Sequence, residues 1–313
     1  MPYLDRDGVK IYYEEQGSGP AVLLSHGYSA SARMWQGQLE ALSDCYHLIA
    51  FDMRGHDRSD SPDDPAQYSH ELTIGDMSSV LDACSVRRAV IGGLSLGGFM
   101  SLAFHLAHPE RTIALVLFDT GPGYKKDGPR EEWNKMARAR AAQLEKDGLD
   151  TAQASAEVRV AHHRSAGGLA LAARGMLTQN DGRVIDSLPE IRVPTLVLAG
   201  AEDKMFIPSA EYMGAKIPGA EKLILTNAGH AANIDQPAAF NAAVAEVPGS
   251  SDNRIVAVRS LHRSSLKIRR RSRRAHCTAG PLSARFGGSS HRPGRLGPGH
   301  FPEQIFVTAA GQE

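Results

Sequence analysis

A serine between an apolar strand-like segment and an apolar helix-like segment is the first residue in this 313-residue chain that could do chemistry. It is Ser95, in the run Gly-Gly-Leu-Ser-Leu-Gly-Gly that starts at Gly92. A hydroxyl on a sharp strand-to-helix turn is an exposed nucleophile, but such a turn leaves no room for side chains two residues before and after it. Gly93 and Gly97 occupy those positions. The run predicts a nucleophile elbow, although a glycine-rich turn with an incidental serine would have the same pattern.

A serine hydroxyl needs a base, and the base needs an acid that orients it. Asp203 follows the strand-like segment Thr195–Ala199, and His230 follows the strand-like segment Lys222–Leu225. Open α/β sheets place their ligands just beyond the carboxyl ends of the strands. The chain order serine, acid, histidine is also the order found with nucleophile elbows. We therefore predict a catalytic triad of Ser95, Asp203 and His230.

The segments that must position these residues alternate between strand and helix patterns. Apolar strands separated by helices imply a parallel sheet covered on both faces, which is an α/β fold. The strand candidates are Val9–Glu15, Ala21–Leu24, His47–Phe51, Arg88–Gly92, Ala114–Phe118, Thr195–Ala199 and Lys222–Leu225. The helix candidates between and after them are Arg33–Leu42, Leu72–Cys84 and Ala238–Val247.

The segment 121–189 breaks this alternation, because no strand pattern occurs in it. Glu131–Leu144 and Thr151–Arg164 have helical patterns, and Gly167–Leu177 is rich in Ala and Leu. We predict that 121–189 is a small helical cap inserted into a core made of residues 1–120 and 190–247.

Composition excludes several classes of protein. Hydrophobic residues are 42% and charged residues 22% of the chain, which is ordinary for a globular enzyme and not for a disordered chain. No apolar run reaches the roughly 18 residues of a membrane-spanning helix, and the N-terminus shows no secretory signal. The 3 cysteines are far apart and odd in number, which fits reduced thiols. We expect a cytoplasmic protein with no membrane partner.

The formal net charge of zero hides two unlike parts. Residues 1–247 hold 23 Lys and Arg against 32 Asp and Glu, whereas residues 248–313 hold 12 against 3. Arg, Ser, Gly and Pro make 33 of the last 66 residues, a composition that cannot bury enough apolar surface to fold. We predict a basic, disordered tail at 248–313. We interpret it as translation in a shifted reading frame; the alternative is an evolved arm for nucleic acid or anionic membranes.

Several separate motifs resemble those of the α/β-hydrolase superfamily, across about residues 2–247. The matching segments are the His-Gly turn at His26-Gly27-Tyr28, the D-x-R-G-x-G-x-S-like loop at Asp52–Ser59, the elbow at Gly93–Gly97, the acid loop at Asp203, and the histidine loop at Gly229-His230 with Asp235-Gln236-Pro237. One position departs from the family pattern, because Asp57 stands where the family usually has glycine. Asp tolerates left-handed backbone better than most residues, so we interpret this as a tolerated variation.

The resemblance implies an eight-stranded, mostly parallel sheet with the cap inserted after the sixth strand. It also implies an oxyanion hole formed by the backbone N–H groups of Tyr28 and Leu96. No metal or organic cofactor is needed by such a site. The pairs His105/His108 and His162/His163 have no third ligand at suitable spacing.

Other assignments have competitors. Asp119, after Ala114–Phe118, could supply the acid instead of Asp203, because some family members carry the acid after that earlier strand. Glu202 is expected to be solvated. Five apolar side chains could line the acyl pocket or could simply pack in the core or cap: Met34, Trp35, Tyr124, Trp133 and Phe206.

The function that the resemblance implies is a serine esterase-like hydrolase of a small carboxylic ester or lactone. The same triad also serves enol-lactone hydrolysis, C–C bond hydrolysis and cofactor-free perhydrolysis in the family. Ser95 argues against an epoxide hydrolase or haloalkane dehalogenase, since those relatives use aspartate at its position. A non-enzymatic small-ligand receptor on the same fold is the alternative of another class. We expect no nucleic-acid partner except through the basic tail.

Overall fold

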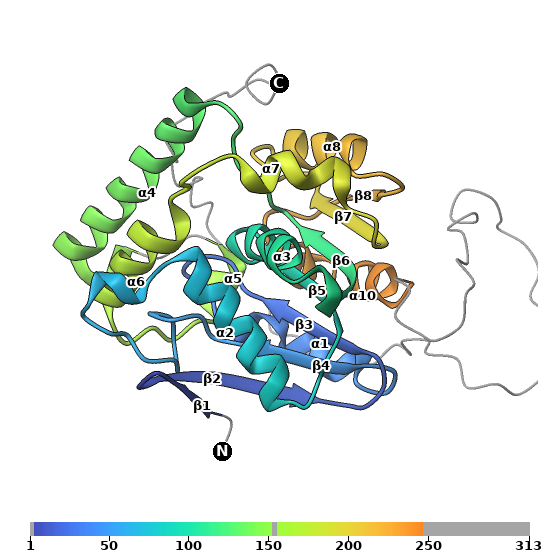
Figure 1. The fold of residues 1–313 in the computed structure, drawn as a ribbon, viewed down its shortest axis with the longest axis horizontal. Coiled ribbons are helices and arrows are strands. Elements are labelled where there is room, and N and C mark those ends of the chain that lie inside the picture. Colours follow the sequence, from blue (N-terminus) through green and yellow to red (C-terminus); the bar gives the residue numbers. More distant parts are fainter. Residues whose placement is uncertain (1–2, 152–154, 247–313) are drawn as a thin grey trace, which may run out of the picture.

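One sheet forms the centre of the protein, for which a computed structural model describes residues 3–151 and 155–246 (Figure 1). Its strand order is β1-β2-β4-β3-β5-β6-β7-β8. β1 pairs antiparallel with β2 and β2 with β4, and every other neighbouring pair is parallel. The strands are β1 (Tyr3–Arg6), β2 (Val9–Gln16), β3 (Ala21–Ser25), β4 (His47–Phe51), β5 (Ala89–Leu94), β6 (Thr112–Phe118), β7 (Thr195–Gly200) and β8 (Glu221–Leu225). The prediction of an α/β fold with a mostly parallel, eight-stranded sheet is confirmed.

The central strands formed as predicted because both of their faces are covered. β3, β5 and β7 are buried at every residue, so their sequences are continuous runs of small and aliphatic residues instead of alternating ones. The edge strand β1 was not predicted. Its sequence, Tyr-Leu-Asp-Arg, is short and half-exposed, and the strand is stabilised by its pairing with β2.

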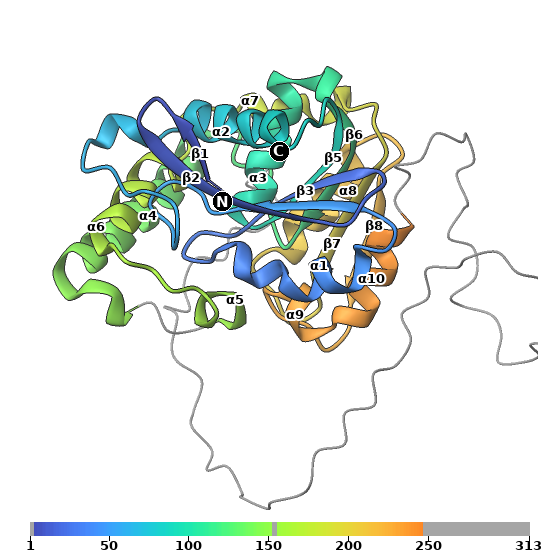
Figure 2. The same cartoon turned by 90° about the horizontal axis from the view of Figure 1, so that it is seen from below.

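Helices cover the two faces of the sheet in separate layers (Figure 2). The side chains of α2, α3 and α8 belong to the apolar core on one face, and those of α1 and α10 to the core on the other. The helices are α1 (Gln36–Leu42), α2 (His70–Ala83), α3 (Leu96–Ala107), α4 (Asp127–Asp147), α5 (Ala156–Arg159), α6 (Ala166–Ala172), α7 (Arg183–Ser187), α8 (Ile207–Lys216), α9 (Ala232–Asp235) and α10 (Pro237–Ala245).

Short helical turns connect these elements. They are η1 (Ala32–Trp35), η2 (Pro65–Gln67), η3 (Pro109–Arg111), η4 (Gly148–Thr151), the π-helical turn η5 (Ala173–Leu177) and η6 (Leu188–Glu190).

The chain between β6 and β7 contains the helices α4 to α7 and, in its described part, no strand. α4 and α6 stand to one side of the sheet, in green at the left of Figure 1. They share a small apolar cluster of their own, which includes Ala141, Leu144 and Leu169 and packs against Tyr28 of the core. We call this region, residues 121–189, the cap.

Three further expectations concern membrane-spanning helices, thiols and the tail. No helix within 3–151 and 155–246 is long and apolar enough to cross a membrane. Cys84 has a free thiol. The predicted tail, residues 248–313, lies outside the described residues, as does Cys277.

Candidate active site

Ser95 lies at a strained turn between β5 and α3. Its φ of 53° and ψ of −115° are unusual for a residue with a side chain. A Cβ on Gly93 would lie 2.5 Å from the carbonyl carbon of Gly97, and a Cβ on Gly97 would lie 2.2 Å from the backbone oxygen of Ser25. The crowding that the sequence predicted two residues before and after the serine is therefore present, and only glycine fits at either place.

A buried threonine, Thr120, stabilises the backbone of the elbow, and the sequence analysis did not identify it. The Thr120 hydroxyl donates to the backbone oxygen of Ser95 at 2.6 Å, and the Ser95 N–H donates to the Phe118 oxygen at 2.9 Å. A Cβ on Gly98 would lie 2.5 Å from Thr120 Cγ2, so the threonine also explains this further glycine. The end of β6 thus fixes the backbone on which Ser95 sits.

The His-Gly turn packs directly against the elbow. A Cβ on Gly27 would lie 3.5 Å from the Cβ of Ser95. His26 holds the turn, because its Nε2 accepts the Met53 N–H at 2.9 Å and its Nδ1 can therefore donate to the Gly27 oxygen at 2.7 Å. Burial lowers the pKa of His26 to about 4, so the imidazole stays neutral in this role.

The two predicted oxyanion-hole residues flank this contact. Tyr28 is the next residue of the turn, and its hydroxyl donates to the Leu169 oxygen of the cap at 2.9 Å. Leu96 is the first residue of α3, in the turn where a helix leaves its N–H groups without an intrahelical acceptor. Both backbones therefore come from segments that meet at Ser95.

His230 and Asp203 form a close pair beyond the ends of β8 and β7. Asp203 Oδ2 lies 2.6 Å from His230 Nδ1. The histidine loop is tied by the Gly229 N–H, which donates to Asp235 Oδ2 at 2.8 Å. Glu202, the neighbouring acid, is exposed. The geometry therefore pairs the histidine with the acid that the sequence favoured.

The pairing with Asp203 determines the tautomer of the His230 imidazole and raises its pKa. A carboxylate can only accept, so Nδ1 carries the hydrogen, and in the neutral imidazole Nε2 has the lone pair. Burial alone would lower the pKa of His230, but the hydrogen bond and charge of Asp203 outweigh it and raise the pKa. The ring of Phe206 stacks on the imidazole, with centroids 5.2 Å apart. The imidazole of His230 is thus held between the Asp203 carboxylate and the Phe206 ring.

Asp119, the competing acid, is buried just after the end of β6, and its Oδ1 does not bind His230. That oxygen accepts the Gly200 N–H at 2.7 Å. Asp119 is nevertheless close to the pair, because its carboxyl interacts with Asp203 and with His230. It is therefore a neighbour of the predicted triad and not its hydrogen-bonding member.

The five candidate pocket residues separate into different environments. Trp35 and Met34 are buried in the core, where the Trp35 ring lies 5.9 Å from that of Phe118. Tyr124 and Trp133 pack on each other at the start of the cap. The Phe206 ring stacks on the imidazole of His230, a triad candidate.

Asp57, the departure from the family motif, binds the cap. Its φ is 39°, in the left-handed region that Asp tolerates. Its Oδ2 accepts from Arg33 Nε at 2.7 Å and from the His162 N–H at 3.2 Å, and its own N–H donates to His163 Nδ1 at 3.1 Å. Arg164 Nε donates to the backbone carbonyl oxygen of Asp57 at 2.7 Å. The residue that we interpreted as tolerated is thus also a tie between core and cap.

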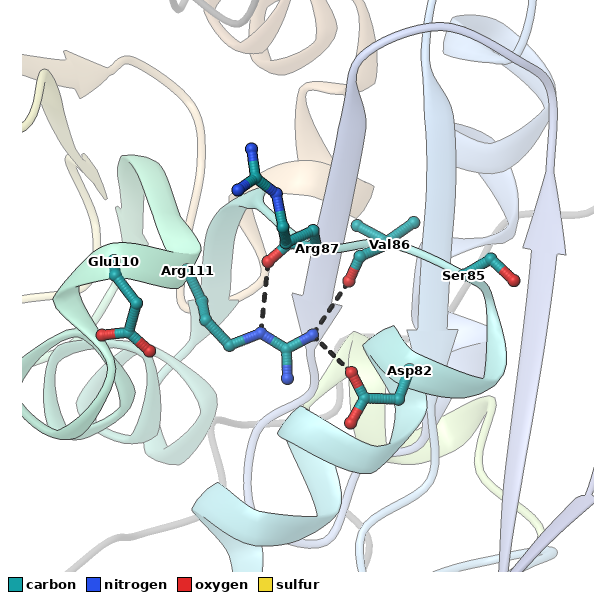
Figure 3. Close-up of a pocket in the computed structure, with 6 residues that line it drawn as sticks. All are labelled: Asp82, Ser85, Val86, Arg87, Glu110 and Arg111. Atoms are coloured by element: carbon teal, nitrogen blue, oxygen red, sulfur yellow. Dashed lines mark hydrogen bonds and ion pairs between the residues drawn. The ribbon is translucent and has the colours of Figure 1, made fainter.

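Other side-chain clusters offer less chemistry. Within the described ranges, no group of three or more His, Cys, Asp and Glu residues could hold a metal ion. A hollow near the amino ends of β5 and β6 is lined by Arg111 among others (Figure 3). The Arg111 guanidinium already donates to Asp82 and to the backbone oxygens of Val86 and Arg87, so it holds loops together.

Comparisons with known proteins agree with this architecture. A model of the alpha/beta hydrolase family matches residues 22–243. A Bacillus subtilis (strain 168) protein, provisionally named 2-succinyl-6-hydroxy-2,4-cyclohexadiene-1-carboxylate synthase, is 29% identical over 261 residues, which are 77% of this chain and 95% of that protein.

Two solved structures extend the likeness. The enol-lactonase from Burkholderia xenovorans LB400 matches with a TM-score of 0.68 and 25% identity, over 79% of this chain and 99% of that one. A thermophilic esterase from Thermogutta terrifontis matches with a TM-score of 0.68 and 26% identity, over 78% of this chain and 95% of that one. The chain therefore belongs to the alpha/beta hydrolase family and is an enzyme of that family.

Proposed function

We propose that this enzyme is a serine hydrolase that cleaves a small carboxylic ester or lactone through an acyl-enzyme. The observation that carries the proposal is the 2.6 Å pair of His230 Nδ1 and Asp203 Oδ2, on the same edge of the sheet as the Ser95 elbow. Membership of the alpha/beta hydrolase family supports it.

The chemistry would begin with attack of Ser95 Oγ on the substrate carbonyl carbon, while His230 Nε2 takes the hydroxyl proton. The oxyanion that forms would accept hydrogen bonds from the N–H groups of Tyr28 and Leu96, each worth about 2.7–4 kcal/mol in enzymes of this kind. Asp203 would hold the imidazole and stabilise its charged form.

The tetrahedral intermediate would then break the carbon–oxygen bond to the alcohol, which receives the proton from His230. Water, activated by the now neutral His230, would attack the acyl group on Ser95 and release the carboxylic acid. With a lactone, the alcohol and the acid are parts of one molecule, so a single hydroxy acid leaves.

An enol-lactone is one substrate class that a specific comparison supports. The enol-lactonase from Burkholderia xenovorans LB400 aligns over 99% of its own length. Hydrolysis of an enol-lactone uses the same steps, but the released enol becomes a ketone. The match to an esterase at the same TM-score of 0.68 supports a simple ester as the substrate to the same extent.

The experiment is a substrate panel measured on the full chain and on Ser95→Ala. It would contain p-nitrophenyl acetate and butyrate, saturated lactones and an enol-lactone. We expect turnover of at least one class by the native chain and its loss in Ser95→Ala. Binding of these compounds without turnover would contradict the proposal and favour a receptor, whereas full activity in Ser95→Ala would exclude a serine hydrolase.

A further inference from the structure

Asp119 is a fully buried acid beside the proposed triad to which the steps above give no role. Its N–H donates to the Leu198 oxygen at 2.9 Å, and its Oδ1 accepts the Gly200 N–H at 2.7 Å, so β7 holds it at two points. Its φ of 42° lies in the left-handed region, which is strained for a residue with a Cβ. The fold therefore holds this carboxyl in one fixed direction at some energetic cost.

The other oxygen of Asp119, Oδ2, is buried and receives no N–H or O–H from any residue of the described part. Burial raises the pKa of Asp119, and the Asp203 carboxyl lies near enough that its charge and a side-chain hydrogen bond raise this pKa further. Asp203 already has a hydrogen-bond partner, because its Oδ2 accepts the Nδ1–H of His230. Two ionised carboxylates in such contact repel each other, whereas one proton between them turns the contact into a hydrogen bond.

We propose that Asp119 carries this proton at neutral pH and donates it from Oδ2 to the Asp203 carboxylate, as a positioning residue for the triad, a role that rests on the proposed function. Asp203 keeps the negative charge because it faces the imidazole of His230. Asp119 Oδ1 instead accepts the Gly200 N–H. Glu157 is the further acid whose charge reaches His230.

The electrostatics support this placement of the proton. Burial raises the pKa of Asp119 to about 8 against the opposing hydrogen bond from the Gly200 N–H, and the charge of Asp203 adds to the rise. The two carboxyls would then share a single negative charge near pH 7, which matches the single positive charge that His230 acquires during the reaction.

The same proton has a consequence for stability. The folded pKa of Asp119 lies above its ordinary value of 3.8, so the folded state binds an extra proton between about pH 4 and pH 8. The contribution of Asp119 to the free energy of unfolding therefore falls as the pH rises through this window. Above about pH 8 it no longer changes, because the carboxyl is ionised in both states.

Two substitutions separate the functions of the carboxyl. Asp119→Asn keeps an acceptor for the Gly200 N–H and an N–H donor toward Asp203, although the amide is a weaker donor. Asp119→Leu removes both. We expect kcat to fall about threefold to tenfold in Asp119→Asn and about 100-fold in Asp119→Leu. A structural role through the Gly200 N–H alone would also be rescued by the amide, so the two roles are separated by the infrared band and by the pH dependence of stability.

Infrared spectroscopy of the full chain tests the proton itself. The native chain should show the C=O band of a buried protonated carboxylic acid at pH 6, and the band should lose about half of its intensity by about pH 8 and be absent from Asp119→Asn. The stability of Asp119→Asn should also fall less between pH 4 and pH 8 than that of the native chain. The infrared band and the pH dependence of stability test the proton on Asp119 even if Asp119→Leu does not fold.

Three results would overturn the proposal. One is absence of the band from the native chain at pH 6. Another is a loss of activity in Asp119→Asn as large as that in Asp203→Asn, and the third is native activity in a folded Asp119→Leu. Full activity in Ser95→Ala would instead remove the proposed function, while the infrared band would still report the proton on Asp119.

Discussion

The carboxyl edge of the sheet, which carries the triad candidates, and the contact of Asp57 with the cap are held by different kinds of interaction. Around Ser95 the backbone is so crowded that Gly93 and Gly97 have no alternative residue. The cap meets the core through apolar packing, to which Met176 and Ile185 contribute, and also through polar ties such as the Asp57 contacts with His162 and His163. Crowded backbone leaves no room for any residue except glycine, whereas single hydrogen bonds can be removed one at a time by substitution. The edge should therefore control chemistry and the cap should control substrate binding.

The largest effects are expected at the edge. Ser95→Ala and His230→Ala should each lower kcat by several orders of magnitude with the fold intact, because each removes a reacting group. The double variant should be little worse than either, since triad members act as a unit. Steady-state kinetics with the best substrate of the panel, together with circular dichroism, would measure this. Additive losses would mean that the two residues do not act together.

The next effect concerns the acid. Asp203→Asn should lower kcat about 10⁴-fold, because the amide favours the wrong imidazole tautomer. Asp119→Asn should lose far less. Glu202→Gln is the matched control, because this exposed neighbour should leave kinetics unchanged. If Asp119→Asn proved the more damaged variant, the acid would belong to the end of β6.

A smaller effect of a different kind is expected at the tie between core and cap. Asp57→Gly keeps a residue that accepts a φ of 39° but removes the carboxylate that binds Arg33 and the His162 N–H. We expect KM to rise about tenfold with kcat changed less, since two hydrogen bonds outside the chemistry are lost.

Asp57→Asn retains an acceptor for the His162 N–H and should lie between Asp57→Gly and the native chain. A drop in kcat with unchanged KM in Asp57→Gly would show that the distinction between edge and cap is false.

The same contrast explains what the sequence could predict. β3, β5, β6 and β7 were recognisable because a buried parallel strand must be continuously apolar. The elbow was recognisable because its glycines are obligatory. The cap segment Thr151–Arg164, predicted as helical, contains only the short helix Ala156–Arg159 in its described part.

Polar ties leave no such pattern in a sequence. His162 and His163 follow that short helix and reach Asp57, which is 105 and 106 residues away in the chain. Thr120 likewise contacts Ser95 across 25 residues. A hydrogen bond between distant residues carries no periodicity, so these site residues could be found only from the structure.

The smallest effect is expected from the tail. Ending the chain after Val247, with a few helix-completing residues restored, should leave the melting temperature and the turnover of the native chain unchanged. The reason is compositional, because residues 248–313 are rich in Arg, Ser, Gly and Pro. Thermal unfolding and turnover of the two chains, measured side by side, would test this. Loss of folding would show that the tail covers the core and that the domain boundary is wrong.

The central claim, that Ser95 is an activated nucleophile, is tested most directly by labelling with a fluorophosphonate and peptide mapping by mass spectrometry. We predict a single adduct on the peptide that contains Ser95, none in Ser95→Ala, and much slower labelling in His230→Ala. Labelling of another residue, or equal labelling of Ser95→Ala, would contradict the account.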